Sequence, residues 1–241
     1  MNPSIKRLAV SAFVSGGVIL GGAQVSTALA DEGALARGGK LYDKWYSVAK
    51  AEKPKETHKL WPASNDKKKG ATTWRCKSCH GWDYSGADGA YKSGSYKTGI
   101  KGIRGMAGAD TAAIIKILRD DAHKFAGKMD ERDLMDLASF VSKGQVDMDT
   151  YIDRATKSPK GGDAAKGANY YNTMCAQCHG ADGRLPKDMP KSLGALMGNP
   201  WEVMHKILNG QPNERMPAMR ALDRQVTVDI MAHLATLPKE K

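Results

Sequence analysis

Cysteine is scarce in this 241-residue sequence, which contains only four. All four fall in two short stretches with the same spacing, Cys76-Lys-Ser-Cys79-His80-Gly and Cys175-Ala-Gln-Cys178-His179-Gly. A structural zinc site needs a second pair of ligands within roughly 12 to 20 residues of the first. The two stretches lie 99 positions apart and neither has such a partner nearby, which argues against zinc. A thioredoxin-like redox pair does not require the histidine, and disulfides would leave both histidines unexplained.

Long apolar runs are also missing, except for one near the N-terminus. Residues 8–25 are apolar and rich in Gly and Ala, follow Lys6 and Arg7, and precede Ala28-Leu29-Ala30. A short positive start, an apolar stretch and a small-x-small site predict a signal peptide over residues 1–30. A retained membrane anchor is the alternative, but glycines and serines interrupt the run, which falls short of the ~20 residues a span needs. We therefore expect export and no membrane span after removal of the signal.

Acidic residues are fewer than basic ones, 26 against 37, which gives a formal net charge of +11 at pH 7. Loss of Lys6 and Arg7 with the signal peptide leaves +9. A basic surface attracts acidic partners over long range, so the charge favours partner proteins with acidic docking surfaces. Nucleic acid is the usual alternative for a basic protein. An exported chain rarely meets it, and we expect no nucleic-acid partner.

The repeated Cys-x-x-Cys-His pattern is the attachment pattern of c-type haem. Two thiols on one helical turn add across the two vinyl groups of the porphyrin, and the next residue places its imidazole under the ring to bind iron. The sequence therefore predicts two covalently bound haem c groups. The attaching residues are Cys76, Cys79, Cys175 and Cys178, and the proximal iron ligands are His80 and His179. With all four thiols used in this way, no disulfide is expected.

Helical periodicity and capping residues dominate the rest of the chain. They predict helices at residues 32–50, 110–118, 130–143, 163–174, 201–208 and 223–237. Gly38-Gly39 weakens the first pattern, and the alternative is a helix that begins only after this pair. Residues 51–73 are lysine-rich and contain prolines, which predicts an extended loop. The Gly/Ser/Tyr-rich segment that follows the first motif, up to residue 105, is too irregular for a helix. Its aromatics either cover the porphyrin and bond its propionates or form local loop cores: Trp82, Tyr84, Tyr91 and Tyr96.

A six-coordinate haem needs a second ligand opposite the proximal histidine. In the second half of the chain the candidate is Met216, which precedes Pro217 and follows His179 by 37 positions. A thioether ligand favours ferrous iron and raises the potential. Met219 is the main alternative ligand. If Met216 does not bind iron, it is a methionine of the apolar core.

The first half has no Met-Pro. Aligning Asp130 with Asp223, a shift of 93, places His123 opposite Met216, and His123 follows His80 by 43 positions. We predict His123 as the distal ligand of the first haem, with Met129 and then Met106 as alternatives. His58 also lies within the first half, but a lone histidine in a lysine-rich loop is more often exposed. A bis-histidine first haem would have a lower potential than a His/Met second haem.

Taken together, the two haem motifs and Met216-Pro217 resemble the tandem class I dihaem cytochromes c of the bacterial periplasm. This resemblance implies an all-α fold of two tandem cytochrome c domains, each with a few helices around a covalently attached haem. The implied division is a first domain at 31–150, a polar linker at 151–162 and a second domain at 163–241. The first domain departs from the family in its N-terminal extension, its Gly/Tyr-rich insert and its missing Met-Pro loop.

The function implied by the resemblance is single-electron transfer between periplasmic redox partners, with no catalytic residues. The alternative is a dihaem oxidoreductase, similar to thiosulfate dehydrogenases or dihaem peroxidases, with one open or unusually ligated iron. Those thiosulfate dehydrogenases typically use a cysteine as distal ligand, and here all four cysteines lie in the haem motifs. The usual dihaem peroxidases are longer. A membrane-bound oxidase or reductase subunit is disfavoured by the removable leader.

Overall fold

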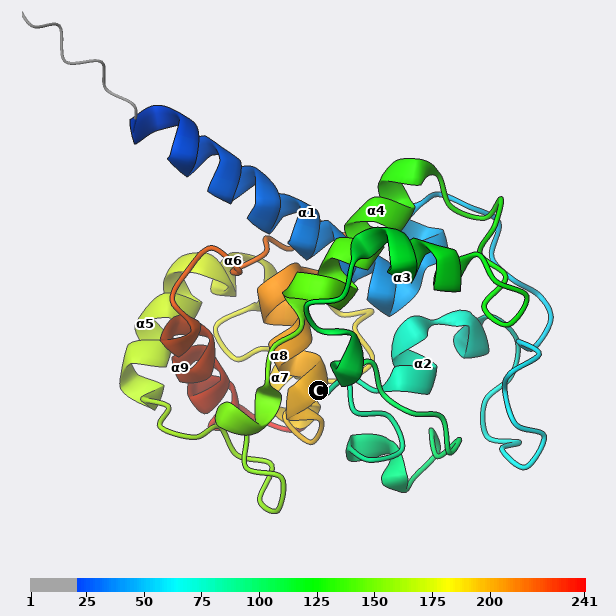
Figure 1. Ribbon diagram of the computed structural model, residues 1–241. Coiled ribbons are helices and arrows are strands. Elements are labelled where there is room, and N and C mark those ends of the chain that lie inside the picture. The colour runs from blue at the N-terminus through cyan, green and yellow to red at the C-terminus, as the bar shows by residue number, and fades with distance from the viewer. Residues whose placement is uncertain (1–20) are drawn as a thin grey trace, which may run out of the picture.

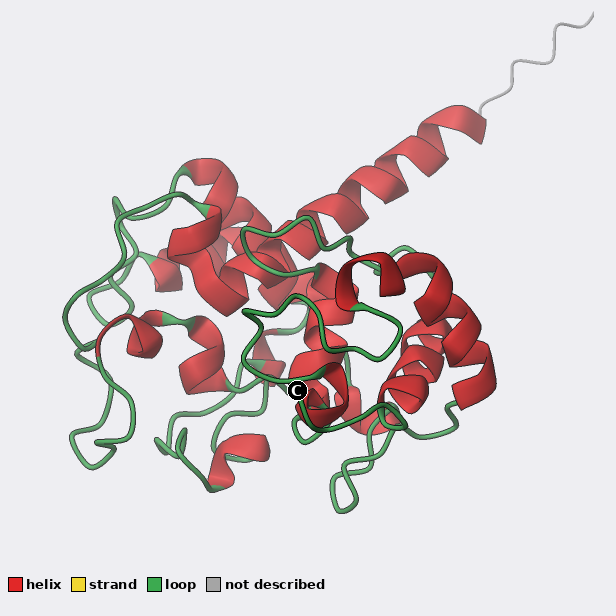
Figure 2. Cartoon of the chain, turned by 180° about the vertical axis from the view of Figure 1, so that it is seen from behind, coloured by secondary structure: helices red, strands yellow, loops and turns green. Residues whose placement is uncertain are grey.

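The computed structural model describes residues 21–241, and every regular element in this part of the chain is helical (Figures 1 and 2). The only extended pairings there are two isolated bridges, Gly86 with Lys101 and Ile152 with Pro159. The prediction of an all-α chain is confirmed. Most of the predicted signal peptide, residues 1–20, lies outside the described residues. Within residues 21–241, no helix combines the length and the apolar character that a bilayer crossing requires.

The helices occur in the predicted order. They are α1 (Gly21–Val48), α2 (Cys76–His80), α3 (Thr111–Leu118), α4 (Glu131–Ser139), α5 (Ala164–Met174), α6 (Ala176–His179), α7 (Leu193–Leu196), α8 (Pro200–Asn209) and α9 (Arg224–Leu234). Short 3-10 turns lie at Gly70–Trp74, Ala90–Lys92, Arg104–Met106 and Met148–Thr150, and a π-helical turn at Phe140–Gly144 extends α4. An aspartate caps α3, α4, α5 and α9 by accepting a hydrogen bond from a backbone N–H of the first turn. These caps explain why the helix starts were predictable.

Two helix pairs cross in the same manner, α1 with α4 and α5 with α9 (Figure 1). Each crossing has a glycine at its centre. A Cβ at Gly38 would overlap the carbonyl oxygen of Asp136, and a Cβ at Gly167 would overlap that of Asp229. Only glycine allows the helices to approach this closely. The helix does not begin after Gly39, because both glycines lie inside α1, Gly38 against α4 and Gly39 against Asn209 of α8.

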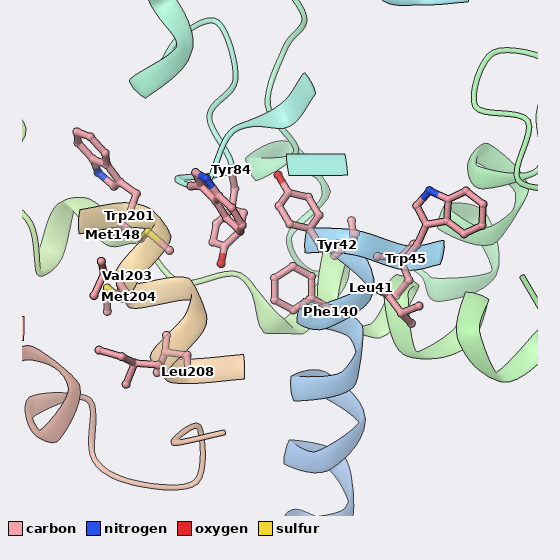
Figure 3. Close-up of a cluster of buried hydrophobic side chains, with 14 of the residues drawn as sticks. Leu41, Tyr42, Trp45, Tyr84, Phe140, Met148, Trp201, Val203, Met204 and Leu208 are labelled. Atoms are coloured by element: carbon pink, nitrogen blue, oxygen red, sulfur yellow. The ribbon is translucent and has the colours of Figure 1, made fainter. Parts of the chain in front are cut away.

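Apolar side chains from residues 31–150, here called the first half, and from residues 163–241, the second half, form one continuous cluster (Figure 3). Leu41, Tyr42 and Trp45 enter it from α1, and Met204 and Leu208 from α8, all essentially inaccessible to solvent. Helix α1 contacts α8 directly. The halves therefore share a core, and they are not separate globules on a tether.

The segment predicted as a polar linker, residues 151–162, lies against both halves. Ile152 is fully buried, and Arg154 donates a 2.7 Å hydrogen bond to Asp83 of the first half. Lys157 donates to the carbonyl of Gly198 in the second half, at 3.3 Å. Hydrogen bonds from its two basic side chains to both halves hold this segment in place.

Candidate functional site

Both Cys-x-x-Cys-His motifs form a short helix that ends on a glycine. Helix α2 is followed by Gly81 at φ 84° and α6 by Gly180 at φ 75°, a backbone region that glycine adopts without strain. The carbonyl of each glycine accepts a hydrogen bond from a tyrosine on the preceding long helix. Tyr42 donates to Gly81 at 2.6 Å, and Tyr171 donates to Gly180 at 2.5 Å. The same tyrosine contact thus anchors both motifs.

The four cysteines of the motifs all lie in the described part of the chain, and no disulfide joins any of them there. Cys76, Cys79 and Cys175 are half-buried and Cys178 is exposed. Burial raises the pKa of the Cys79 thiol to about 12 and that of Cys175 to about 11. Since no disulfide uses them in the described chain, all four cysteines are available for thioether bonds to haem.

Both histidines predicted to be proximal ligands, His80 and His179, are held through the ring atom Nδ1. His80 Nδ1 lies 2.7 Å from the carbonyl oxygen of Lys101, and His179 Nδ1 lies 3.2 Å from that of Leu185. A carbonyl only accepts, so Nδ1 carries the proton and donates it in each case. Nε2 of each ring is then left with its lone pair. An N–H donated to a carbonyl is the usual support of a histidine that binds a metal through its other nitrogen.

His123 is held in the same way. Its Nδ1 lies 3.1 Å from Asp120 Oδ1, and its backbone N–H donates to the same oxygen at 2.7 Å. The ring centroids of His80 and His123 lie 6.4 Å apart, and the ring planes are inclined by 21°. An iron between two imidazole nitrogens, each at about 2.0–2.1 Å, would separate the ring centroids by about 6.3 Å. The distance between the two ring centroids therefore agrees with the predicted ligation of one iron by both histidines.

The other candidates for this ligand have different surroundings. Met129 is buried in the apolar cluster, and Met106 is partly buried against it. His58 was expected to be exposed, and this expectation is wrong, because only 7% of the residue is accessible. Its Nδ1 accepts from the N–H of Leu60 at 3.1 Å, and its Nε2 lies 3.2 Å from the carbonyl oxygen of His123. Both ring nitrogens of His58 are thus occupied by the protein, which leaves neither for iron. Burial also lowers the pKa of His58.

In the second half, Met216 lies half-buried in an irregular segment between α8 and α9. This segment returns to α8 through the N–H of Met219, which donates to the carbonyl of Ile207 at 2.9 Å. Met219 packs against the apolar cluster. In the first half, the segment carrying His123 returns to the end of α3 in the same way, since Phe125 N–H donates to Leu118 at 3.0 Å. His123 and Met216 therefore occupy corresponding segments. His123 lies two residues before Phe125, and Met216 lies three residues before Met219, whose backbone N–H groups make these two hydrogen bonds.

The four aromatics named as possible haem contacts divide into two groups. Trp82 and Tyr84 face His205 of the second half, at 5.0 Å between ring centroids for Trp82 and through a 2.8 Å hydrogen bond for Tyr84. Tyr96 stacks on Tyr91 and its hydroxyl accepts from Lys77 at 3.1 Å. The buried hydroxyl of Tyr91 has no hydrogen-bond partner among residues 21–241.

A second buried donor without a partner in the described chain is the indole N–H of Trp201, at the start of α8. Leaving such a donor unpaired costs about 1–3 kcal/mol. A carboxylate of a bound group, such as a haem propionate, is one kind of acceptor that would satisfy such a donor. The pattern of the sequence marked Trp201 only as the start of a helix.

Residues 162–234 match the family described as cytochrome C oxidase, cbb3-type, subunit III. No curated protein and no solved structure matches the chain. The matched span begins just before α5 and ends with α9, so it contains the second haem motif, Met216 and the crossing of α5 with α9. This part of the chain is a c-type cytochrome domain, a class of protein that binds haem c covalently and transfers electrons.

Proposed function

We propose that the protein is a periplasmic dihaem cytochrome c that passes single electrons between redox partners. The observation that carries the proposal is the paired geometry of the two motifs. In each, a proximal histidine donates Nδ1–H to a backbone carbonyl, and a helix tyrosine anchors the following glycine. The second motif lies in the cytochrome domain, and the first repeats its local construction.

Two tandem cytochrome domains account for the wider repeat. Gly38 and Gly167 lie 129 positions apart, as do Tyr42 and Tyr171, and each pair has the same role in its half. Asp136 and Asp229, which receive the two glycines, lie 93 apart. An N-terminal helix thus crosses a C-terminal helix beside the haem motif in both halves.

The ligand sets differ between the two sites. We assign His80 and His123 to the first iron, and His179 and Met216 to the second. When bound, haem c supplies an iron that exchanges one electron between its ferric and ferrous states. Asp120 and the carbonyl of Lys101 bind Nδ1 of the two imidazoles of the first site, so Nε2 of each ring would be the atom that holds the iron. A thioether raises the potential relative to a second imidazole, so electrons run downhill from the first site to the second.

The partner is best sought among acidic redox proteins. Six lysines between residues 53 and 69 make the extension ahead of the first motif strongly basic. Such a surface accelerates encounter with an acidic protein and does so less at high salt. The matched family is named for an oxidase subunit, so an oxidase complex is one partner to test. The signal peptide assigns the protein to the periplasm, which cell fractionation checks.

A low-temperature EPR spectrum of the oxidised protein, with its mass, tests the proposal. The mass should equal that of the mature chain plus two haems. Two low-spin signals are expected, one typical of His/His and one of His/Met ligation, and His123→Ala should remove only the first. A large high-spin signal in the wild type would mean an open iron, and the oxidoreductase alternative would replace electron carriage.

A further inference from the structure

The first half contains a long insertion that the second half lacks. Tyr42 precedes Cys76 by 34 positions, whereas the corresponding Tyr171 precedes Cys175 by 4. The difference of 30 residues is the lysine-rich segment that contains His58. We propose that this insertion is a clamp for the distal ligand loop of the first haem, with His58 as the positioning residue. The inference rests on the proposed ligation by His123.

His58 connects the insertion to the His123 loop through its ring. Since Nδ1 accepts from the N–H of Leu60, Nε2 carries the proton and donates to the carbonyl of His123 at 3.2 Å. This bond acts on the backbone of the ligand residue itself. The imidazole of His123 remains free to be oriented by Asp120.

The other contacts of His58 tie it to the chain just ahead of the first haem motif. Its backbone N–H donates to Thr73 Oγ1 at 2.9 Å. Its ring packs edge-on against the indole of Trp74, with centroids 4.3 Å apart. Trp74 is two residues before Cys76. His58 therefore connects the chain at the start of the first haem motif to the loop that carries His123.

The backbone beside His123 needs such a support. Lys124, the next residue, has φ 59°, a left-handed conformation that residues with a Cβ rarely adopt. Conformations of this kind persist only where the surroundings hold them. The peptide between His123 and Lys124 receives the His58 hydrogen bond on its carbonyl, and its N–H donates to the carbonyl of Asp120 at 2.9 Å. Without His58 the loop loses one of these two restraints, and His123 swings away from His80 more often.

His58 therefore acts through His123 and does not touch the metal. Its effect is to keep the two imidazoles at their fixed separation. A distal loop held in this way closes the first iron to small external ligands. Loss of the clamp raises the fraction of molecules in which that iron has an open position.

The test compares His58→Phe with His58→Gln in the full haem-loaded protein. Phenylalanine fills the site and keeps the packing on Trp74 but cannot donate, whereas glutamine retains a donor at a similar reach. We expect His58→Phe to bind carbon monoxide at the reduced first haem about tenfold faster, in proportion to the loss of one buried hydrogen bond. The His/His EPR signal should weaken, and His58→Gln should restore most of both properties.

Two controls are built into the chain. The second haem of the same molecule should keep its EPR signal and potential, which shows that the variant is folded. His233→Gln changes a histidine that contacts Tyr171 in the second half, and should leave the first haem unaltered. If His58→Phe does not fold, Thr73→Val removes the acceptor of the His58 N–H and should produce a smaller change in the same direction.

The outcomes separate the clamp from the ligand assignment. A wild-type His/His signal that His123→Ala removes and His58→Phe leaves unchanged, with unchanged carbon monoxide binding, would overturn the clamp alone. A wild-type protein without a His/His signal would overturn both proposals. Equal effects of phenylalanine and glutamine would assign His58 to packing and would also refute positioning by the hydrogen bond.

Discussion

His205 should make the stability of the folded protein fall in mild acid. It lies on α8 with no accessible surface, between the two halves. Its Nε2–H donates to the carbonyl of Gly39 at 2.9 Å, and its Nδ1 accepts from the hydroxyl of Tyr84 at 2.8 Å. This arrangement requires the neutral ring. Burial lowers the pKa of His205 to about 3, although Asp43 and the Gly39 carbonyl both act to raise it.

The direction and size of the effect follow from this shift. Above pH 6.5, the ordinary value, His205 is neutral in the folded and unfolded chains, and its contribution to stability is fully present. Below pH 6.5 the unfolded chain takes up a proton that the folded protein refuses until about pH 3. Each pH unit in this window costs about 1.4 kcal/mol of unfolding free energy. Between pH 6.5 and 4.5 the loss is thus about 3 kcal/mol.

The measurement is guanidinium unfolding of the wild type and His205→Gln from pH 7.5 to 4.5, followed by far-UV circular dichroism. Glutamine offers a donor and an acceptor but does not titrate. At pH 7.5 the variant should be less stable by about 1–3 kcal/mol, because its bonds to Gly39 and Tyr84 are imperfect. The difference should close by about 3 kcal/mol at pH 4.5. The haems and their axial histidines are common to both proteins, so their titration cancels. A difference that stays constant with pH would refute the reasoning.

Two further substitutions test the packing and the second haem. Gly167→Ala should lower the unfolding free energy by about 1–3 kcal/mol or more, because the new methyl overlaps the carbonyl of Asp229 on α9. Gly33→Ala, where a Cβ meets nothing within 4 Å, is the matched control and should be neutral or slightly stabilising, and equal effects would contradict the crossing. Met216→Ala should lower the midpoint potential of the second haem, as redox titration would show, while Met219→Ala should not. A reversed pattern would make Met219 the ligand.

The local features of the fold were predictable from the sequence. Helix starts depend on a capping aspartate and a few apolar residues, and all these lie within one or two turns of each other. Asp110, Asp130, Asp163 and Asp223 each cap a helix that begins where the sequence predicts it. The haem motifs are local as well, because their chemistry requires the thiols and the imidazole on one turn.

Features that depend on distant contacts were not predictable. His58 reads as an exposed loop histidine until Thr73 and the carbonyl of His123, 65 positions away, are known to surround it. His205 gave no signal at all, because its partners lie 121 and 166 positions away in the sequence. The polar residues of the segment at 151–162 similarly find their ion and hydrogen-bond partners in both halves.

On the proposed ligation, the departures of the first half from the second concern one feature, the distal ligand of the first haem. The offset between corresponding positions falls from 129 at the tyrosines to 99 at the motifs and 93 at the last helices. The first decrease in this offset, from 129 to 99, is due to the insertion that carries His58. The second decrease equals the difference between the 43 residues from His80 to His123 and the 37 from His179 to Met216. The approach to a distal histidine is therefore longer than the approach to a distal methionine. A longer loop has more freedom to lose on ordering, and a loop with Lys124 in a strained conformation needs external support. If His123 and Met216 are the distal ligands, the histidine, the longer loop and the His58 clamp belong to one structural difference between the halves, and the first haem would have the lower potential.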